Sequence, residues 1–281
     1  MSHGTKRSKV QISWEMVTPA MAKKWLAHNT HNRHLFKPWA SQLARDMTSG
    51  KWRTTHEGIA FGPNGILLDG QHRLQAVVES GKTIKMLVCR GLDVGSQLVC
   101  GGGKKRKAFE QITLGGSIGS VDTADEATAR SMLRGYGSAT KPTAQELEDF
   151  IGRHREAIQF AKVNIHRRRM IPGISTGAVR AVVARAWYSA EIPTLMHFCD
   201  VLTGGEPRTG DGVITLLWRA IIIENNQPRR TFSHKDRYAK TERALHAYLQ
   251  GEKLTKLYPA TKELFPLVGD TDAAPALAAA Q

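Results

Sequence analysis

Cysteines, long apolar runs and acidic residues are all scarce in this chain of 281 residues, and each scarcity excludes a class of protein. The three cysteines, Cys89, Cys100 and Cys199, include no Cys-x-x-Cys pair. An odd number at these spacings argues against a disulfide framework and a zinc ribbon, and favours a reducing compartment. No apolar run approaches the roughly 18 residues of a membrane span, and the first residues lack the apolar segment of a signal peptide. We therefore expect a cytoplasmic protein with no membrane partner.

The shortage of acidic residues leaves the chain strongly basic. It has 40 lysines and arginines against 25 aspartates and glutamates, a formal net charge of +15 at pH 7 and a pI near 10.0. Such an excess favours a polyanionic partner, and nucleic acid is the leading candidate. With 41% hydrophobic residues, the chain has the composition of a folded protein and the length to bury a sizeable core.

The most informative segment is the turn Asp69-Gly70-Gln71-His72-Arg73. The apolar run before it predicts a short strand over 66–68, and the periodicity after it predicts a helix over 73–80. Glycine allows a tight turn, and the first N–H groups of a helix have no acceptor within the helix. Together with the helix dipole and a guanidinium group, these N–H groups predict a phosphate site. The alternative is that Asp69 caps the helix and His72 and Arg73 are solvated.

Around this turn, the residues indicate a compact α+β unit followed by a helical one. The first half alternates helices over 19–26 and 38–47, extended segments over 52–61 and 84–89, and the elements of the turn. In the second half, helices are predicted over 123–133, from 144, and over 177–188, 193–202, 213–224 and 233–249, with a capping box at Thr143. We expect the strongly apolar helix 213–224 to be central to the core.

Several motifs resemble those of one superfamily. They are Asn32-Arg33, Asp46-Met47 with Gly50-Lys51-Trp52, the segment 57–61, and Leu68 to Leu74 with Ala76. In these features the chain resembles the ParB/sulfiredoxin superfamily, and more closely its phage-type ParB-like proteins with an Asp-Gly-Gln-His-Arg motif. The resemblance covers about residues 14–110.

The resemblance implies a small mixed-sheet ParB/sulfiredoxin-like N-terminal domain followed by an all-α C-terminal domain. The expected organisation is a basic tail (1–13), a nucleotide-binding domain (14–115), a helical domain (116–268) and a disordered tail (269–281). It also implies a phage-encoded protein that acts in the cytoplasm of a bacterial host. Gln71 stands where sulfiredoxin has its reactive cysteine, so sulfinic-acid repair is excluded on this alignment. The segment 29–33 lacks the acidic base of the related free-serine kinases.

The superfamily binds a nucleotide phosphate at this helix start, which implies ATP or CTP with Mg²⁺ here. The candidate phosphate-binding residues are Gly70, Gln71, His72, Arg73, Arg33 and Asn32. Asp69 is the candidate Mg²⁺ ligand or base, and Glu57 is a second candidate catalytic acid, with a solvated strand carboxylate as its alternative. The candidate DNA-binding residues are Lys104, Lys105, Arg106 and Lys107, which follow three glycines, and Arg167, Arg168 and Arg169. Each basic cluster could equally be a solvated loop.

These features leave three functions open. The first is an enzyme, an NTPase or phosphotransferase, that hydrolyses the nucleotide or transfers its phosphoryl group with DNA as partner or substrate. The second is a non-catalytic, partition-like DNA-binding regulator. The third, ranked lower, is a ParB-like nuclease, which would need a metal site with two carboxylates. A homodimer is a further candidate state of the protein.

Overall fold

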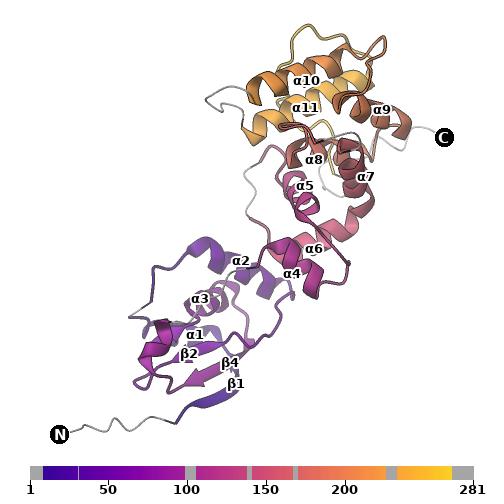
Figure 1. Cartoon of the computed structure of the whole chain (residues 1–281). Coiled ribbons are helices and arrows are strands. Elements are labelled where there is room, and N and C mark those ends of the chain that lie inside the picture. Colours follow the sequence, from indigo (N-terminus) through magenta and orange to yellow (C-terminus); the bar gives the residue numbers. More distant parts are fainter. Residues whose placement is uncertain are drawn as a thin grey trace. The chain divides into compact units, whose positions relative to one another are not determined.

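The computed structural model describes residues 9–30, 32–98, 106–137, 141–166, 170–225 and 233–267. The chain divides into two compact units, Met1–Arg106 and Lys107–Gln281 (Figure 1). Among the described residues, none of the helices combines the length and the apolar character needed to cross a membrane.

The first unit is built on a four-stranded mixed sheet of order β1-β4-β2-β3. Its strands are β1 (Gln11–Val17), β2 (Ile59–Phe61), β3 (Leu67–Asp69) and β4 (Ile84–Arg90). β4 pairs antiparallel with β1 and parallel with β2, and β2 and β3 form an antiparallel hairpin. The sheet places the end of β3, and therefore the turn at Gly70, beside β2.

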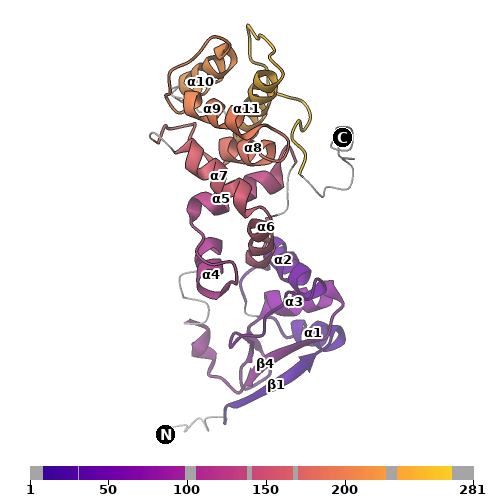
Figure 2. The same cartoon turned by 90° about the vertical axis from the view of Figure 1, so that its right-hand side faces the viewer.

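Three helices belong to this unit, α1 (Pro19–Leu26), α2 (Lys37–Thr48) and α3 (Gln71–Ser80), and both α1 and α2 pack against α3. In both views α1 and α3 lie over the strands (Figures 1 and 2). The core between helices and sheet includes Val17, Ile59, Phe61, Leu74 and Val88. The predicted start of α1 is confirmed, because the Thr18 hydroxyl accepts the Met21 N–H at 3.2 Å and a proline opens the helix.

Two expectations for this unit differ from the structure. The segment 1–13 was expected to be a tail, but β1 begins at Gln11, inside that segment. The extended segment expected over 52–61 forms a strand only at Ile59–Phe61. Both differences arise because a strand is defined by its pairing partner, and β4, the partner of both strands, is far along the sequence.

The described part of the second unit contains helices and no strands. They are α4 (Ala108–Gly115), α5 (Thr123–Arg134), α6 (Ala144–Arg153), α7 (Arg155–Ile165), α8 (Gly177–Ala186), α9 (Ile192–Leu202), α10 (Gly212–Asn225) and α11 (His234–Leu249). A mixed sheet followed by helices confirms the α+β composition. The capping box at Thr143 is also confirmed, because its hydroxyl accepts the Glu146 N–H at 3.1 Å. The helical unit begins at Lys107, so α4 belongs to it rather than to the first unit.

The most buried helix of the second unit is α8, where every residue from Ala178 to Ala186 is buried. Its alanines and valines allow α5, α7 and α11 to approach closely from different sides. The expectation that 213–224 would be the central helix is therefore wrong. α10 buries Val213, Ile214 and Leu217 but leaves Ile223 exposed. The apolar residues of α10 extend around more of its surface than the neighbouring helices contact.

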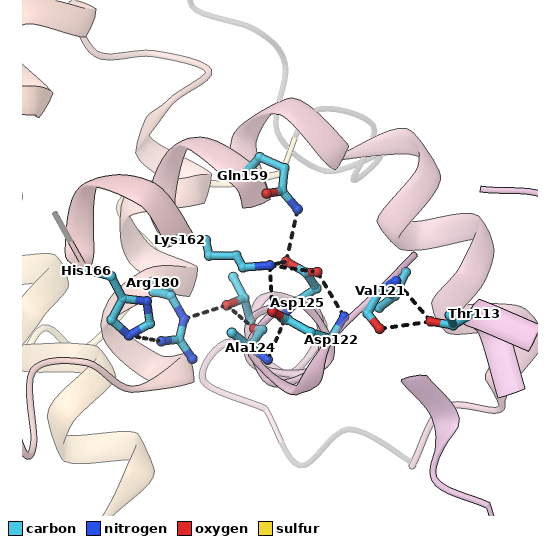
Figure 3. A network of polar contacts seen from close by, with 10 residues as sticks. Thr113, Val121, Asp122, Ala124, Asp125, Gln159, Lys162, His166 and Arg180 are labelled. Carbon is cyan, nitrogen blue, oxygen red and sulfur yellow. Dashed lines mark hydrogen bonds and ion pairs between the residues drawn. The ribbon is translucent and has the colours of Figure 1, made fainter. Parts of the chain in front are cut away.

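A network of charged side chains, of which Asp125 and Arg180 are buried, connects three of these helices (Figure 3). The Lys162 ammonium on α7 lies 2.7 Å from a carboxylate oxygen of Asp122 and donates to Asp125 at 3.1 Å. On α8, Arg180 donates from Nε to the Thr128 hydroxyl of α5 at 2.9 Å. Burial alone would raise the pKa of Asp122, but the hydrogen bond from Lys162 and those from backbone N–H groups outweigh it and lower the pKa to about 2. The ion pairs thus fix α5 against α7.

A second buried carboxylate joins α11 to the C-terminal segment. One oxygen of Glu242 accepts the backbone N–H groups of Leu264 and Phe265 at 2.9 and 3.2 Å. Burial and the nearby charge of Glu263 together raise the pKa of Glu242 to about 7, although the hydrogen bonds from the backbone of Leu264 and Phe265 act in the opposite direction. The charged form of Glu242 is therefore costly to keep in the folded protein.

We predict that this carboxyl makes stability fall as pH rises. Its pKa is about 7 in the folded protein, against a usual 4.5, so the folded state binds the extra proton between these values. The contribution of Glu242 to stability is then greatest near pH 4.5 and decreases as the pH rises through about 7. Glu242→Gln keeps the acceptor oxygen and removes the charge, so urea unfolding should show a flatter pH dependence and equal or higher stability above pH 7. The exposed Glu191→Gln serves as control, and parallel pH curves for wild type and Glu242→Gln would contradict the prediction.

Candidate functional site

The turn before α3 requires glycine and leaves the helix without a side-chain cap. Gly70 is the N-cap residue, with φ of 101°. A Cβ atom there would lie 2.6 Å from Ile59 Cδ1 and 3.2 Å from the carbonyl oxygen of Gly58. Asp69 does not cap the helix, because its carboxylate accepts from Arg73 instead. The capping alternative is thus wrong, and the first turn of α3 presents backbone N–H groups with no acidic residue among them.

Arg73 brings together the two carboxylates expected to be catalytic. Its Nη2 donates to Asp69 at 3.0 Å and its Nη1 to Glu57 at 3.2 Å. Its Nε and Nη2 also donate to the carbonyl oxygen of Gly58, at 3.1 and 2.8 Å. The guanidinium group therefore links the first turn of α3 to the segment that leads into β2. The sequence identified all three charged residues but not this contact between them.

The same contacts bear on the predicted Mg²⁺ site at Asp69. A guanidinium group bound to both Asp69 and Glu57 occupies carboxylate oxygens and adds a positive charge where a metal ion would lie. In the described ranges, no three His, Cys, Asp or Glu side chains gather as a metal-ligand set. The residues at the turn thus do not fit a resident Mg²⁺ ion, and we derive no chemical step through one.

Gln71 and Asn32, expected as phosphate ligands, form an internal amide network instead. Gln71 is only 4% exposed; it donates to the carbonyl oxygen of Arg33 at 2.9 Å and accepts from Asn29 at 3.0 Å. Asn32 donates to Asn29 at 2.6 Å and to the carbonyl oxygen of Leu67 at 2.8 Å. These amides join the start of α3 and β3 to the segment between α1 and α2. Their polar atoms are directed at protein groups rather than at a ligand.

His72 also contacts the segment between α1 and α2. Its Nε2 accepts the backbone N–H of Phe36 at 3.1 Å, so this nitrogen carries no proton in the observed geometry. Phe36 is the N-cap residue of α2 and has no side-chain cap of its own. The first turn of α3 thus positions the start of α2, and His72 does not donate from Nε2 to a phosphate.

Exposed cations lie on the segment between α1 and α2, which Gln71 joins to this turn. Arg33, His34 and Lys37 are all exposed, and the backbone of Arg33 is bound by Gln71. Of the predicted phosphate ligands, Arg33 has the exposed side chain, while Arg73 is mostly buried. The surroundings of the uncapped helix start are therefore more basic than the turn alone indicates.

Only part of the predicted DNA-binding set falls in the described residues. Arg106 and Lys107 are exposed, and Lys107 is the N-cap residue of α4. Lys104, Lys105 and Arg167 to Arg169 lie outside the described residues.

The boundary between the two units shows how the charge of the chain is distributed. Residues 1–106 contain 17 lysines and arginines against 6 acidic residues, and residues 107–281 contain 23 against 19. Most of the excess positive charge thus belongs to the first unit.

Comparison with family models, with curated proteins and with solved structures found no match to this chain. The resemblance to the ParB/sulfiredoxin superfamily remains a prediction from its motifs.

We predict that Gln71 stabilises the fold in the absence of any ligand. Gln71→Ala removes a buried amide and leaves the Asn29 side chain and the Arg33 carbonyl oxygen without this hydrogen-bond partner, so stability should fall by about 1–3 kcal/mol. Gln75→Ala, four residues along the same helix, removes a contact with Glu79 at the surface and should change stability by less than about 0.5 kcal/mol. Urea unfolding of the ligand-free protein measures both. Equal stabilities of wild type and Gln71→Ala would show that the amide network is not structural.

Proposed function

We propose that the first unit binds the phosphate group of a nucleotide, ATP or CTP, at the first turn of α3. The observation that carries the proposal is the helix start at Gly70, which has no side-chain cap and no acidic residue in its first turn. Such a helix start attracts anions through its N–H groups and its dipole. The resemblance to ParB-like proteins supports the same ligand, because their equivalent turn contacts nucleotide phosphates.

In this proposal, fewer residues contact the phosphate than the sequence predicted. The backbone N–H groups of the first turn bind the phosphate oxygens, and the exposed Arg33 side chain adds a guanidinium group from the neighbouring segment. Gln71 and His72 keep that segment against the helix. Arg73 contributes less than an uncompensated arginine would, because Asp69 and Glu57 balance its charge.

The proposal is one of binding. Hydrolysis or phosphoryl transfer needs a base or a metal-bound carboxylate near the phosphate. One oxygen of Asp69 and one of Glu57 are bound by Arg73, which holds both carboxylates beside a positive charge of the protein itself. The observations therefore favour a non-catalytic nucleotide-binding protein over the expected NTPase or phosphotransferase.

Calorimetric titration tests the nucleotide site. We predict that ATP or CTP binds the wild-type protein and that a nucleoside without phosphate does not. Arg33→Ala should weaken binding by roughly tenfold, because a hydrogen bond to a charged group is lost. Lys82→Ala is the matched control, since it removes an exposed cation just beyond the opposite end of α3 and should leave affinity unchanged.

Two results of this titration would count against the site. If none of ATP, CTP, ADP or GTP binds, the proposed function is wrong. If nucleotide binds equally to wild type and Arg33→Ala but weakly to Lys82→Ala, the phosphate lies elsewhere than at the start of α3.

We further propose that the first unit contacts DNA, as expected of a partition-like regulator. The distribution of charge supports this proposal, because 17 basic residues against 6 acidic ones lie in residues 1–106. Attraction to the DNA backbone scales with the number of phosphates neutralised, and it does not require a sequence-specific contact.

Electrophoretic mobility shifts at two salt concentrations test the DNA contact. We predict that duplex DNA binds and that affinity falls steeply with salt. Two variants change the formal charge equally: the first replaces Lys9, Lys23, Lys24 and Lys82 by glutamine, and the second replaces Lys235, Lys253, Lys256 and Lys262. The first set lies in the first unit and should reduce both affinity and salt dependence, and the second set should have a smaller effect. The reverse order would assign the DNA contact to the helical unit.

A further inference from the structure

β1 is an edge strand with a large apolar stripe. It lies at one end of the sheet and, among the described residues, pairs only with β4. On β1, Ile12, Trp14 and Met16 are 63%, 51% and 57% exposed, and Val10 just before the strand is exposed as well. These residues alternate with others and therefore share the face opposite the helices, where no described helix of the first unit lies (Figures 1 and 2).

This edge has few of the features that prevent strands from pairing. β1 contains no proline, and its register with β4 runs unbroken through seven residue pairs. Its one charged residue, Glu15, is turned toward the helix side, where it binds both Nη atoms of Arg90. Proteins usually protect a strand edge of this length with charges, prolines or bulges, because its free N–H and C=O groups accept another strand. The edge is therefore suited to a partner strand.

The apolar surface continues onto β4. In the register of the two strands, Leu87 lies opposite Trp14 and Cys89 opposite Ile12, and both are partly exposed. The Lys85 ammonium lies 5.8 Å from the centre of the Trp14 ring. The face is thus apolar and cationic, so a polyanion would bind the rim but not the stripe.

We propose that β1 pairs antiparallel with β1 of a second copy of this chain, with the two-fold axis at Trp14. In this register Trp14 lies opposite the partner's Trp14, and Ile12 lies opposite the partner's Met16. On the other face, Ser13 lies opposite the partner's Glu15, so no like charges meet. Directly opposed side chains are the pairs that stabilise a sheet, and two-fold pairing of identical strands is the simplest closed arrangement.

The neighbouring registers are less favourable. Moving the axis to Glu15 sets that carboxylate opposite the partner's Glu15, which is destabilising. Moving it to Ser13 leaves two residues of β1 without a partner within the seven-residue strand. An axis between two residues joins the apolar face of one copy to the helix-covered face of the other, because a shift of one residue reverses every side chain. Trp14 is therefore the centre that uses the whole strand.

Two opposite charge substitutions at Trp14 test this arrangement, which does not depend on the proposed nucleotide site. Light scattering coupled to size exclusion should give twice the 31.0 kDa mass for the wild-type protein. Trp14→Glu alone and Trp14→Lys alone should each give the monomer mass, because like charges then meet at the axis. Dimer affinity should fall by roughly tenfold or more in each. An equimolar mixture of the two variants should recover the dimer, because a carboxylate then faces an ammonium group.

The mixture also separates pairing from misfolding, since a misfolded variant would not recover. Val163→Glu and Val163→Lys, on an exposed position of α7, are the matched controls and should remain dimeric. The proposal is overturned if the wild-type protein is monomeric at all concentrations. It is also overturned if either Trp14 variant stays dimeric, or if the mixture does not recover the dimer.

Discussion

The first unit depends on the polar contacts made by the first turn of α3. Arg73 binds the carbonyl oxygen of Gly58 and two carboxylates, and Gln71 binds the segment between α1 and α2. Both side chains are mostly or wholly buried, so each lost partner would cost the desolvation of a polar group. Through these bonds, one helical turn sets the positions of α2, β2 and β3. The turn is therefore first a structural junction.

Because of this structural role, fewer groups at the turn can bind a ligand. A side chain that binds the protein itself is not free to bind a ligand, and Gln71, His72 and Arg73 all have protein partners. The start of α3 itself has no side-chain cap, because its N-cap residue is Gly70, and its first turn contains no acidic residue. The phosphate site we propose is thus formed by main chain and by Arg33 from the attached segment. Its chemistry is that of a binding site, and the ion pairs of Asp69 and Glu57 argue against a catalytic one.

In the helical unit, the buried charged side chains differ in their partners. Asp125 and Arg180 are almost completely buried, and each has hydrogen-bonding partners on neighbouring helices. Glu242 is also buried, and burial together with the nearby carboxylate of Glu263 raises its pKa to about 7. Ion pairs therefore fix α5 against α7, whereas α11 holds the C-terminal segment with a carboxyl group whose charge is costly.

The sequence by itself determined the features that depend on near neighbours. The caps at Thr18 and Thr143, the glycine at the turn and the apolar periodicity of the helices are local, and each is as predicted. The net charge also follows from the composition alone. Only the tertiary structure decided the partners of Gln71 and Arg73, the pairing of β1 and the burial of α8. Gln71 and Asn29 are 42 residues apart, and β1 pairs with a strand that follows α1, α2 and α3 in the sequence. Such contacts depend on chain folding and not on the neighbouring residues, so no local pattern contains them.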